Sequence, residues 1–220
     1  MKNNIRRIPV TISMITICVL VYLWMVLQGG TTNTAVLIHS GAKYTPLILR
    51  GQWWRLLTAG FIHIGIQHLV INMVTLYFIG MYVEEIYGHW RMLIIYLVSI
   101  LMGNLTSMLF QPLQNVSAGA STGLFGLFGA FIMLGLINRN NPLIQQMVRQ
   151  FLILVVFNIG ADLIMPGVDL AGHLGGLLGG FLCSGMCGST EIGKLSLLKR
   201  FLSGTILIVL IILMFWKAVS

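Results

Sequence analysis

The chain has 220 residues, of which 57% are hydrophobic and 8% are charged, and its mean hydropathy is +0.93. Because about a quarter of the residues in soluble domains are charged, this composition excludes an ordinary soluble protein and indicates a membrane protein. The formal net charge is +8, yet the 13 basic residues form no dense cluster with interleaved aromatic residues. We therefore expect no nucleic-acid partner.

Seven apolar segments can each cross a bilayer as a helix, which requires about 20 mainly apolar residues. We predict helices at residues 8–28, 57–82, 91–110, 119–138, 146–165, 169–187 and 199–216. The expected fold is an all-α membrane protein with one domain over residues 1–220 and a short tail at residues 1–7. The seven helices fill the chain, so we expect no separate soluble domain.

Basic residues in the short connections predict the orientation of the bundle. With the N-terminus in the cytoplasm, nine of the 13 basic residues lie on the inner side, and four lie outside. The outer four are Lys43, Arg50, Arg55 and Lys217. We therefore expect a cytoplasmic N-terminus and an extracytoplasmic C-terminus in a multi-pass protein of the cell membrane, specifically a bacterial plasma membrane.

The first connection, residues 29–56, is long and apolar, and it ends in Gln52-Trp53-Trp54-Arg55. Indole rings and an arginine can contact apolar and wet surroundings at once, so this outer loop is expected to lie partly in the interfacial layer. The alternative is an ordinary aromatic belt with a covering loop. We expect membrane lipids to contact it in either case.

The second predicted helix carries His68 and Asn72, which are four residues apart and therefore share one face. Polar side chains at membrane depth are expected to face the protein interior, because an unpaired polar group in hydrocarbon is costly. After this helix, residues 84–91 are expected to form a compact turn with solvated charges.

Two glycine-rich stretches are expected to bring a serine and a histidine together. In residues 117–130, Ser121 stands among glycines spaced three or four apart, which fall on one side of a helix. In residues 169–180, His173 stands among a similar set. Glycine removes the side chains that would keep two helices apart, so we predict that these two helices pack closely. The glycines are Gly119, Gly123, Gly126 and Gly129 in the first stretch and Gly172, Gly175, Gly176, Gly179 and Gly180 in the second.

In the predicted topology His68, Asn72, Ser121 and His173 share a depth in the outer part of three helices, which indicates a site rather than scattered structural contacts. Neutral imidazole can remove the proton of a serine hydroxyl near neutral pH, so His173 is the candidate base for Ser121. His68, Asn72 and the backbone amide of Ser121 are candidate donors to an oxyanion. Phe125 could lie against the imidazole or belong to the core.

Asp169 precedes His173 by four residues, but it also stands at the first position of its predicted helix. A carboxylate there is better explained as a helix N-cap facing water than as the third member of a triad. We therefore predict a two-residue site. The three cysteines form no CxxC pair, and we predict neither a metal nor a cofactor.

With these residues in view, the chain resembles the rhomboid family of intramembrane serine proteases from about Trp54 to Gly180. The matching motifs are Trp54-Arg55, His68 with Asn72, Gly119-Ala120-Ser121, and Ala171-Gly172-His173-Leu174-Gly175-Gly176. One departure is Thr122, which stands where the family has a second motif glycine, although Gly123 follows directly.

The resemblance implies a Ser121/His173 dyad, an oxyanion pocket that includes His68 and Asn72, and a six-helix core. Residues 199–216 would then be an additional C-terminal helix. It also implies that the substrate is the transmembrane segment of another protein, cut near its outer end at a small residue. The alternatives are a catalytically silent binder of membrane segments and a transporter or channel lined by the polar residues.

Overall fold

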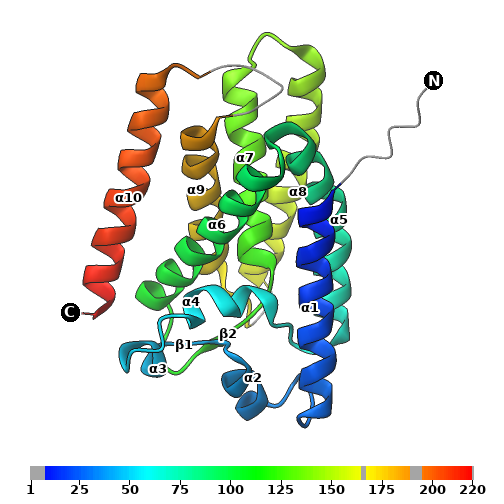
Figure 1. Cartoon of the computed structure of the whole chain (residues 1–220), viewed down its shortest axis with the longest axis vertical. Coiled ribbons are helices and arrows are strands. Elements are labelled where there is room, and N and C mark those ends of the chain that lie inside the picture. The colour runs from blue at the N-terminus through cyan, green and yellow to red at the C-terminus, as the bar shows by residue number, and fades with distance from the viewer. Residues whose placement is uncertain (1–7, 165–166, 189–194, 220) are drawn as a thin grey trace.

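The computed structural model describes residues 8–164, 167–188 and 195–219, most of which are helical (Figure 1). The long helices are α1 (Pro9–Leu27), α5 (Gly65–Tyr87), α6 (His89–Phe110), α7 (Ser121–Ile137), α8 (Pro142–Ile164), α9 (Leu170–Cys187) and α10 (Leu197–Val219). The short elements are α2 (Thr34–Ser40), α3 (Thr45–Leu49), α4 (Arg55–Thr58), the 3₁₀ helix η1 (Ala59–Phe61), β1 (Lys43–Tyr44) and β2 (Val116–Ser117).

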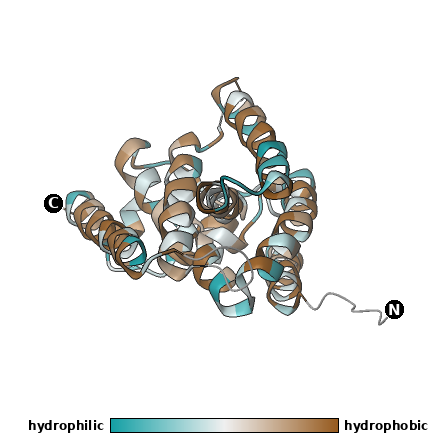
Figure 2. Ribbon diagram, turned by 90° about the horizontal axis from the view of Figure 1, so that it is seen from above, coloured by the Kyte–Doolittle hydropathy of each residue, from teal (hydrophilic) through white to brown (hydrophobic). Residues whose placement is uncertain are grey.

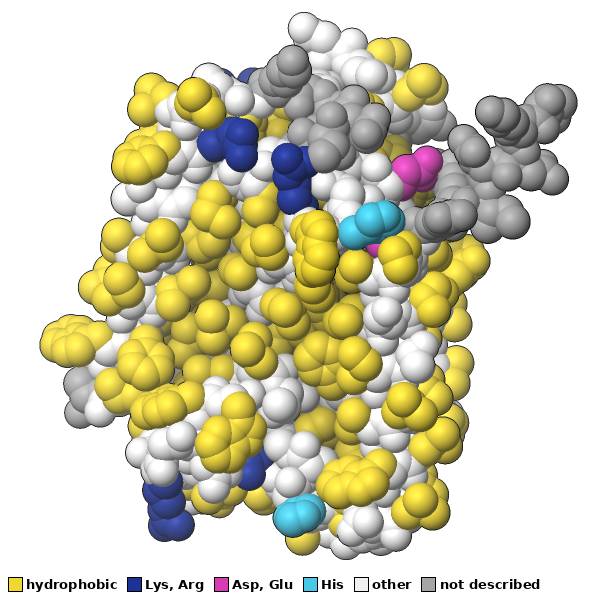
Figure 3. All heavy atoms as spheres, in the orientation of Figure 1, with side chains coloured by type: hydrophobic (Ala, Val, Ile, Leu, Met, Phe, Trp, Pro, Cys, Tyr) yellow, Lys and Arg dark blue, Asp and Glu magenta, His cyan; other side chains and the backbone are white. Residues whose placement is uncertain are grey.

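Six helices in the described part of the chain are long and apolar enough to cross a membrane, and α7 is a shorter apolar helix of 17 residues. On the face drawn in Figure 3, Lys and Arg side chains gather toward the two ends, and the zone between them is mostly hydrophobic. Hydrophobic residues also predominate along the peripheral helices seen from above (Figure 2). The chain is therefore a multi-pass, all-α membrane protein.

Helix α7 lies at the centre of the bundle, and α9 lies beside it and makes its most extensive contacts with α7 and α6 (Figure 1). Helices α1 and α5 pack against each other on one side, and α10 packs against α9 on the other. Helix α8 packs against α7, where the ring of Phe151 stacks on Phe131 with centroids 4.0 Å apart. The short elements α2, α3 and α4 lie together at one end of the bundle, which we call the loop end.

Glycines allow α7 and α9 to approach until their backbones touch, which confirms the predicted close packing. A methyl group added at Gly180 would overlap the carbonyl oxygen of Gly126, and one at Gly176 would overlap the carbonyl oxygen of Thr122. The second glycine face of α9 meets α6, because a methyl group at Gly179 would lie 2.7 Å from an α6 side chain. We call these contacts among α6, α7 and α9 the glycine seam.

The second predicted helix, residues 57–82, is wrong at its beginning. Its first residues form the end of α4 and the 3₁₀ helix η1, and Ile62 is then extended, with φ −99° and ψ 140°. Helix α5 begins only at Gly65, whose φ of +76° favours glycine and reorients the chain. The break places His68 in the first turn of α5.

The end of the same helix lies five residues beyond the predicted position because Glu84 is not solvated. Only 2% of Glu84 is exposed, and its carboxylate accepts hydrogen bonds from the amides of Val10 and Thr11 at 2.9 and 2.8 Å. Nδ1 of His89 lies 2.6 Å from the same carboxylate. Glu84 thus binds the otherwise unpaired first amides of α1, and α5 continues to Tyr87.

The connection at residues 29–56 forms an ordered cover at the loop end, built from α2, β1, α3 and the start of α4. Strand β1 pairs antiparallel with β2, the segment that leads into α7, with Lys43 opposite Ser117. The remaining predicted helices are present with ends shifted by a few residues, and the C-terminal helix extends from Leu197 to Val219 rather than over 199–216.

Candidate active site

Ser121 is the first residue of α7, and two hydrogen bonds hold the chain just before it. The amide of Gly119 donates to the carbonyl of Ala59 at 3.0 Å, and the amide of Ala120 donates to Nε2 of His63 at 3.3 Å. Gly119 has a φ of +145°, which favours glycine, so the chain turns before the helix begins. The helix therefore starts two residues later than predicted, with the Ser121 hydroxyl at its N-terminus.

His173 lies in the first turn of α9, and its imidazole reaches Ser121. Nε2 of His173 is 2.8 Å from Oγ of Ser121, within hydrogen-bond distance. The imidazole also stacks on the ring of Phe125, with centroids 4.3 Å apart and planes inclined by 10°. Phe125 follows Ser121 by one helical turn, so α7 provides both the hydroxyl and the surface that supports the ring.

His68 and Asn72 enter the same region from α5. Nδ2 of Asn72 donates one N–H to the carbonyl of His68 at 2.8 Å and carries a second N–H. The amide of Ile64 donates to Nδ1 of His68 at 3.4 Å, which makes Nε2 the protonated nitrogen of the neutral ring. Both side chains can therefore present a donor to the site.

Gly119 leaves a gap between His68 and Ser121. A methyl group at Gly119 would lie 2.9 Å from Nε2 of His68 and 3.4 Å from Oγ of Ser121. The first amides of a helix, here including that of Ser121, have no acceptor within the helix. An oxygen atom in this gap would thus lie close to donors of two kinds, a ring N–H and the helix N-terminus.

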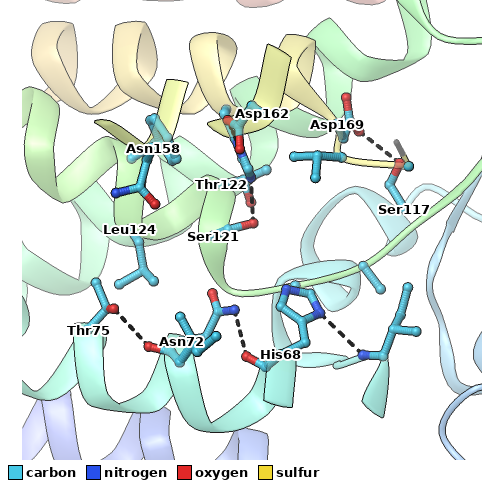
Figure 4. A pocket seen from close by; sticks show the side chains of 18 of the residues that line it. His68, Asn72, Thr75, Ser117, Ser121, Thr122, Leu124, Asn158, Asp162 and Asp169 are labelled. Atoms are coloured by element: carbon cyan, nitrogen blue, oxygen red, sulfur yellow. Dashed lines mark hydrogen bonds and ion pairs between the residues drawn. The ribbon is translucent and has the colours of Figure 1, made fainter. Parts of the chain in front are cut away.

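The site opens into a cavity of about 840 Å³ lined by α5, α7, α8, α9 and the chain before α7 (Figure 4). In Figure 4, His68 and Asn72 lie on one side of Ser121, and Asp162 of α8 lies on the other. Aromatic side chains complete the wall, among them Phe128 of α7. The volume lies within the usual range of ligand cavities, and its wall combines apolar surface with a few polar groups.

Asp162 is one of two site residues that were not predicted from the sequence. Its Oδ2 is 2.6 Å from Nδ1 of His173, the ring nitrogen that faces away from Ser121. A signal for Asp162 was present, because it is one of only five acidic residues and stands within an apolar helix. An ionisable residue in such a helix is expected to face a functional site.

Asp169 is the N-cap of α9, as predicted, but it does not simply face water. Its Oδ1 accepts the amide of Gly172 at 2.9 Å. Its Oδ2 accepts the hydroxyl of Ser117 at 2.8 Å and also that of Ser107. Its two oxygens are thereby occupied in joining α9 to α6 and β2.

Trp54 and Arg55 lie outside the lining of the cavity. Arg55 was expected at a wet interface, but only 5% of it is exposed. Its guanidinium donates to the carbonyls of Ile38 and Ala42 at 2.6 and 3.0 Å and to Gln52 at 2.8 Å. Arg55 therefore holds the cover together, whereas Trp54 is largely exposed.

Thr122 is accommodated by a glycine on another helix. A methyl group at Gly103 of α6 would lie 2.9 Å from the Thr122 side chain, so the absence of a side chain on α6 leaves room for this threonine. Its Oγ1 is buried without a hydrogen-bond partner among the described residues. The threonine thus faces α6 rather than the gap at Gly119.

The other site residue that was not predicted from the sequence is His63, which contacts the chain before Ser121. His63 is fully buried, and its ring lies edge-on to that of His68 with centroids 5.2 Å apart. Burial lowers the pKa of His63 to about 3, so the ring stays neutral and its Nε2 can accept the Ala120 amide. His63 thereby links the α5 side of the site to the chain before Ser121.

The hydrogen-bonded Ser121 and His173 face a cavity inside an apolar helical bundle, an arrangement that would suit a membrane-embedded serine hydrolase. A model of the Rhomboid domain family matches residues 50–190. The chain therefore belongs to the rhomboid family.

Three relatives illustrate this similarity. The chain is 38% identical over 196 residues to rhomboid protease GluP of Bacillus subtilis (strain 168), covering 89% of this chain and 38% of GluP. It is 30% identical to the putative rhomboid protease YdcA of the same organism, covering 75% of this chain and 82% of YdcA. It is 39% identical to RHOMBOID-like protein 7 of Arabidopsis thaliana, covering 70% of this chain and 49% of that protein.

Proposed function

We propose that this chain is an intramembrane serine endopeptidase in which Ser121 is the nucleophile and His173 is the general base. The observation that carries the proposal is the 2.8 Å hydrogen bond between Ser121 Oγ and His173 Nε2, in a chain of the rhomboid family. Neutral imidazole is suited to accept the serine proton near neutral pH.

In the proposed reaction, Oγ of Ser121 attacks a substrate peptide carbonyl while Nε2 of His173 takes the hydroxyl proton. His173 then gives this proton to the leaving amine, the carbon–nitrogen bond breaks, and the substrate acyl group remains as an ester on Ser121. Water attacks the ester, again losing a proton to His173, and this proton returns to Ser121 as the new carboxyl end leaves.

The oxyanion formed in each step would occupy the gap at Gly119. His68 would donate Nε2–H, the second N–H of Asn72 would donate from α5, and the Ser121 amide would donate from the start of α7. The distances of 2.9 and 3.4 Å from a methyl position at Gly119 to His68 and Ser121 support this assignment. Phe125, stacked on His173, would support the base.

The proposed substrate is the membrane span of another protein, cut near its outer end at a small residue. An intact helix hides its carbonyls in intrahelical hydrogen bonds, so the cut segment must be extended when it reaches Ser121. The 840 Å³ cavity has room for such a segment, and its apolar walls suit membrane-derived side chains. Neither alternative, a silent binder or a transporter, is favoured, because the relatives are named as proteases.

The proposed topology has seven spans, with the loop end outside the cell and the start of α1 inside, in a bacterial plasma membrane. Helix α7 would be the seventh span, since 17 residues rise roughly 26 Å, most of the hydrocarbon thickness. In this topology Ser121 would lie below the outer surface, and the cavity would admit the water that the reaction requires. The additional C-terminal helix is then α10 (Leu197–Val219).

The test uses the purified full chain in lipid vesicles with a fluorophosphonate probe and a transmembrane substrate peptide. Wild-type protein is expected to bind the probe covalently and to cleave the peptide, whereas Ser121→Ala should lose labelling and at least about 10³-fold in cleavage rate. Equal labelling or cleavage by Ser121→Ala would overturn the proposal. Thermal unfolding checks that the variant remains folded.

A further inference from the structure

The hydrogen bond between Ser121 and His173 continues through the imidazole ring to a third side chain, that of Asp162. Nδ1 of His173 faces Oδ2 of Asp162 at 2.6 Å, while Nε2 of the same ring faces Ser121 at 2.8 Å. The side chains of His173 and Asp162 are each only 10% exposed, so little water competes for this contact. Three side chains from α7, α9 and α8 therefore form one continuous chain of hydrogen bonds.

The carboxylate determines which nitrogen of His173 carries the proton. An ionised carboxylate can only accept, so Nδ1 of His173 must be the donor in this contact. The neutral ring then has its lone pair on Nε2, the nitrogen that faces the Ser121 hydroxyl. This is the protonation state that a base for Ser121 requires, and the carboxylate also stabilises the imidazolium formed when Nε2 takes the proton.

The other supports of His173 do not provide this function. Phe125 stacks on the ring with planes inclined by 10°, which restrains the plane of the imidazole but not its rotation within that plane. Asp169, on the same helix, is occupied by Gly172 and Ser117. Among the described residues, Asp162 is thus the carboxylate that contacts His173.

We propose that Asp162 is a positioning residue that completes a Ser121–His173–Asp162 triad in this chain. The inference rests on the proposed function, since it assigns a role within the same reaction. It goes beyond the two-residue site that the sequence predicts. Asp162 acts through His173 and does not touch the substrate.

The test compares Asp162→Asn with Asp162→Glu and with Phe151→Ala, using the full chain in lipid vesicles and a transmembrane substrate peptide. Asn removes the charge at nearly constant size, and Glu retains the charge on a longer side chain. Phe151→Ala is the structural control, because it loosens α8 where Phe151 stacks on Phe131, away from His173. Thermal unfolding shows whether each variant is folded.

For Asp162→Asn we expect kcat to fall about 10²- to 10⁴-fold with KM changed less than about 3-fold. Asp162→Glu should recover at least about 10-fold of the lost kcat. Nitrogen-15 NMR of histidine-labelled protein should show the Nδ1–H tautomer of His173 in the wild type and a loss of that preference in Asp162→Asn. Phe151→Ala should lower the unfolding temperature and retain the wild-type tautomer, since it leaves the carboxylate in place.

A folded Asp162→Asn variant with kcat within about 3-fold of the wild type would overturn the role of Asp162. The role of Asp162 would also be overturned if Phe151→Ala lost as much kcat as Asp162→Asn and also lost the preference for the Nδ1–H tautomer. In that case the contact of Asp162 would only hold α8 against α9. The two proposals remain distinguishable. A wild type that neither cleaves the peptide nor binds the probe would reject the proposed function, whereas an active wild type with an equally active Asp162→Asn would reject only the triad.

Discussion

The glycine seam and the flanking helices α5 and α8 contribute to the same site with very different packing. We compare the most apolar stretch of each helix. The share of this stretch that is buried inside the molecule is 56% in α9, 39% in α5 and 11% in α8. The seam carries Ser121 and His173, and the flanks carry His68, Asn72 and Asp162. Backbone contact thus fixes the proposed nucleophile and base, while the groups that would assist them come from more exposed helices.

This difference in packing indicates that the seam and the flanks position their side chains in different ways. Helices that touch through glycines have little freedom to slide, so the 2.8 Å contact between Ser121 and His173 is set by the positions of the backbones themselves. On α5 and α8 each assisting group depends on its own side-chain contacts, for example Asp162 on His173. Substitutions in the seam should therefore damage fold and activity together, and substitutions on the flanks should separate them.

The largest expected effect comes from Gly180→Leu in the seam, with Gly160→Leu on α8 as its matched control. A side chain at Gly180 would overlap the backbone of Gly126, whereas a methyl group at Gly160 would meet nothing within 4 Å. Forcing α7 and α9 apart should lower the free energy of unfolding by about 3 kcal/mol, the upper end of the usual cost of overpacking. Because a 1 Å misplacement can cost about 10²-fold, cleavage should fall at least about 10²-fold.

Thermal unfolding in detergent and peptide cleavage in vesicles measure both effects, and Gly160→Leu should stay close to the wild type in each. Equal stability of the two variants would contradict the view that the seam admits no side chain. A stable but inactive Gly180→Leu would instead show that fold and activity can be separated within the seam, as they are expected to be on the flanks.

The seam could be predicted from sequence because it depends on local regularity. Glycines spaced three or four residues apart fall on one helix face wherever the helix lies, so the two glycine-rich stretches could be predicted to pack together without coordinates. The residue types at Ser121 and His173 then suggested their chemistry. Composition was enough to indicate the membrane, and the family resemblance supplied the remaining expectations.

Contacts between distant segments could not be read in the same way. The Asp162–His173 contact depends on how α8 is rotated toward α9, and no spacing rule fixes that rotation. The contact of His63 with the Ala120 amide joins residues 57 positions apart. The late start of α5 results from the positive φ of Gly65. The apolar pattern of this segment continues across Gly65 and gives no sign of the break. These are tertiary effects that override local propensity.

The second test concerns the flank α5 and compares Asn72→Ala with Asn138→Ala. Each asparagine donates Nδ2 to the carbonyl four residues earlier in its helix, at 2.8 Å for Asn72 and 3.0 Å for Asn138. Of these two asparagines, Asn72 lines the cavity and Asn138 does not. Comparing the two variants therefore distinguishes the loss of an oxyanion donor from the loss of a similar hydrogen bond to the helix backbone.

We expect kcat to fall about 10²- to 10³-fold in Asn72→Ala, which is the usual cost of one oxyanion donor. Activity in Asn138→Ala should stay within about 3-fold of the wild type, and both variants should unfold at similar temperatures. Steady-state cleavage in vesicles measures the first effect. A similar loss in the two variants would assign the effect to α-helix stability, and an active Asn72→Ala would remove Asn72 from the proposed oxyanion pocket.

The smallest expected effect concerns Lys43, in the cover at the loop end of the seam. Lys43 is fully buried, and its Nζ has no hydrogen-bond partner among the described residues. Burial lowers the pKa of Lys43 below its usual value near 10.5, although the nearby Asp169 opposes this shift. Because the unfolded chain then binds more protons than the folded protein, the contribution of Lys43 makes stability increase with pH up to about 10.5.

Lys43→Met should remove this contribution, so we expect the variant to unfold at a higher temperature than the wild type at pH 7. The difference should shrink as the pH rises toward 10, by at most about 1.4 kcal/mol per pH unit. Thermal unfolding in detergent between pH 7 and pH 10 measures it, with the exposed Lys199→Met as the control for a lost surface charge. If Lys43→Met lowered stability at pH 7, the attraction to Asp169 would outweigh the cost of burial. The attraction between Lys43 and Asp169 would then hold the cover against the start of α9. In that case the cover would resemble the flanks, where single side-chain contacts fix the position of each group, and would differ from the seam.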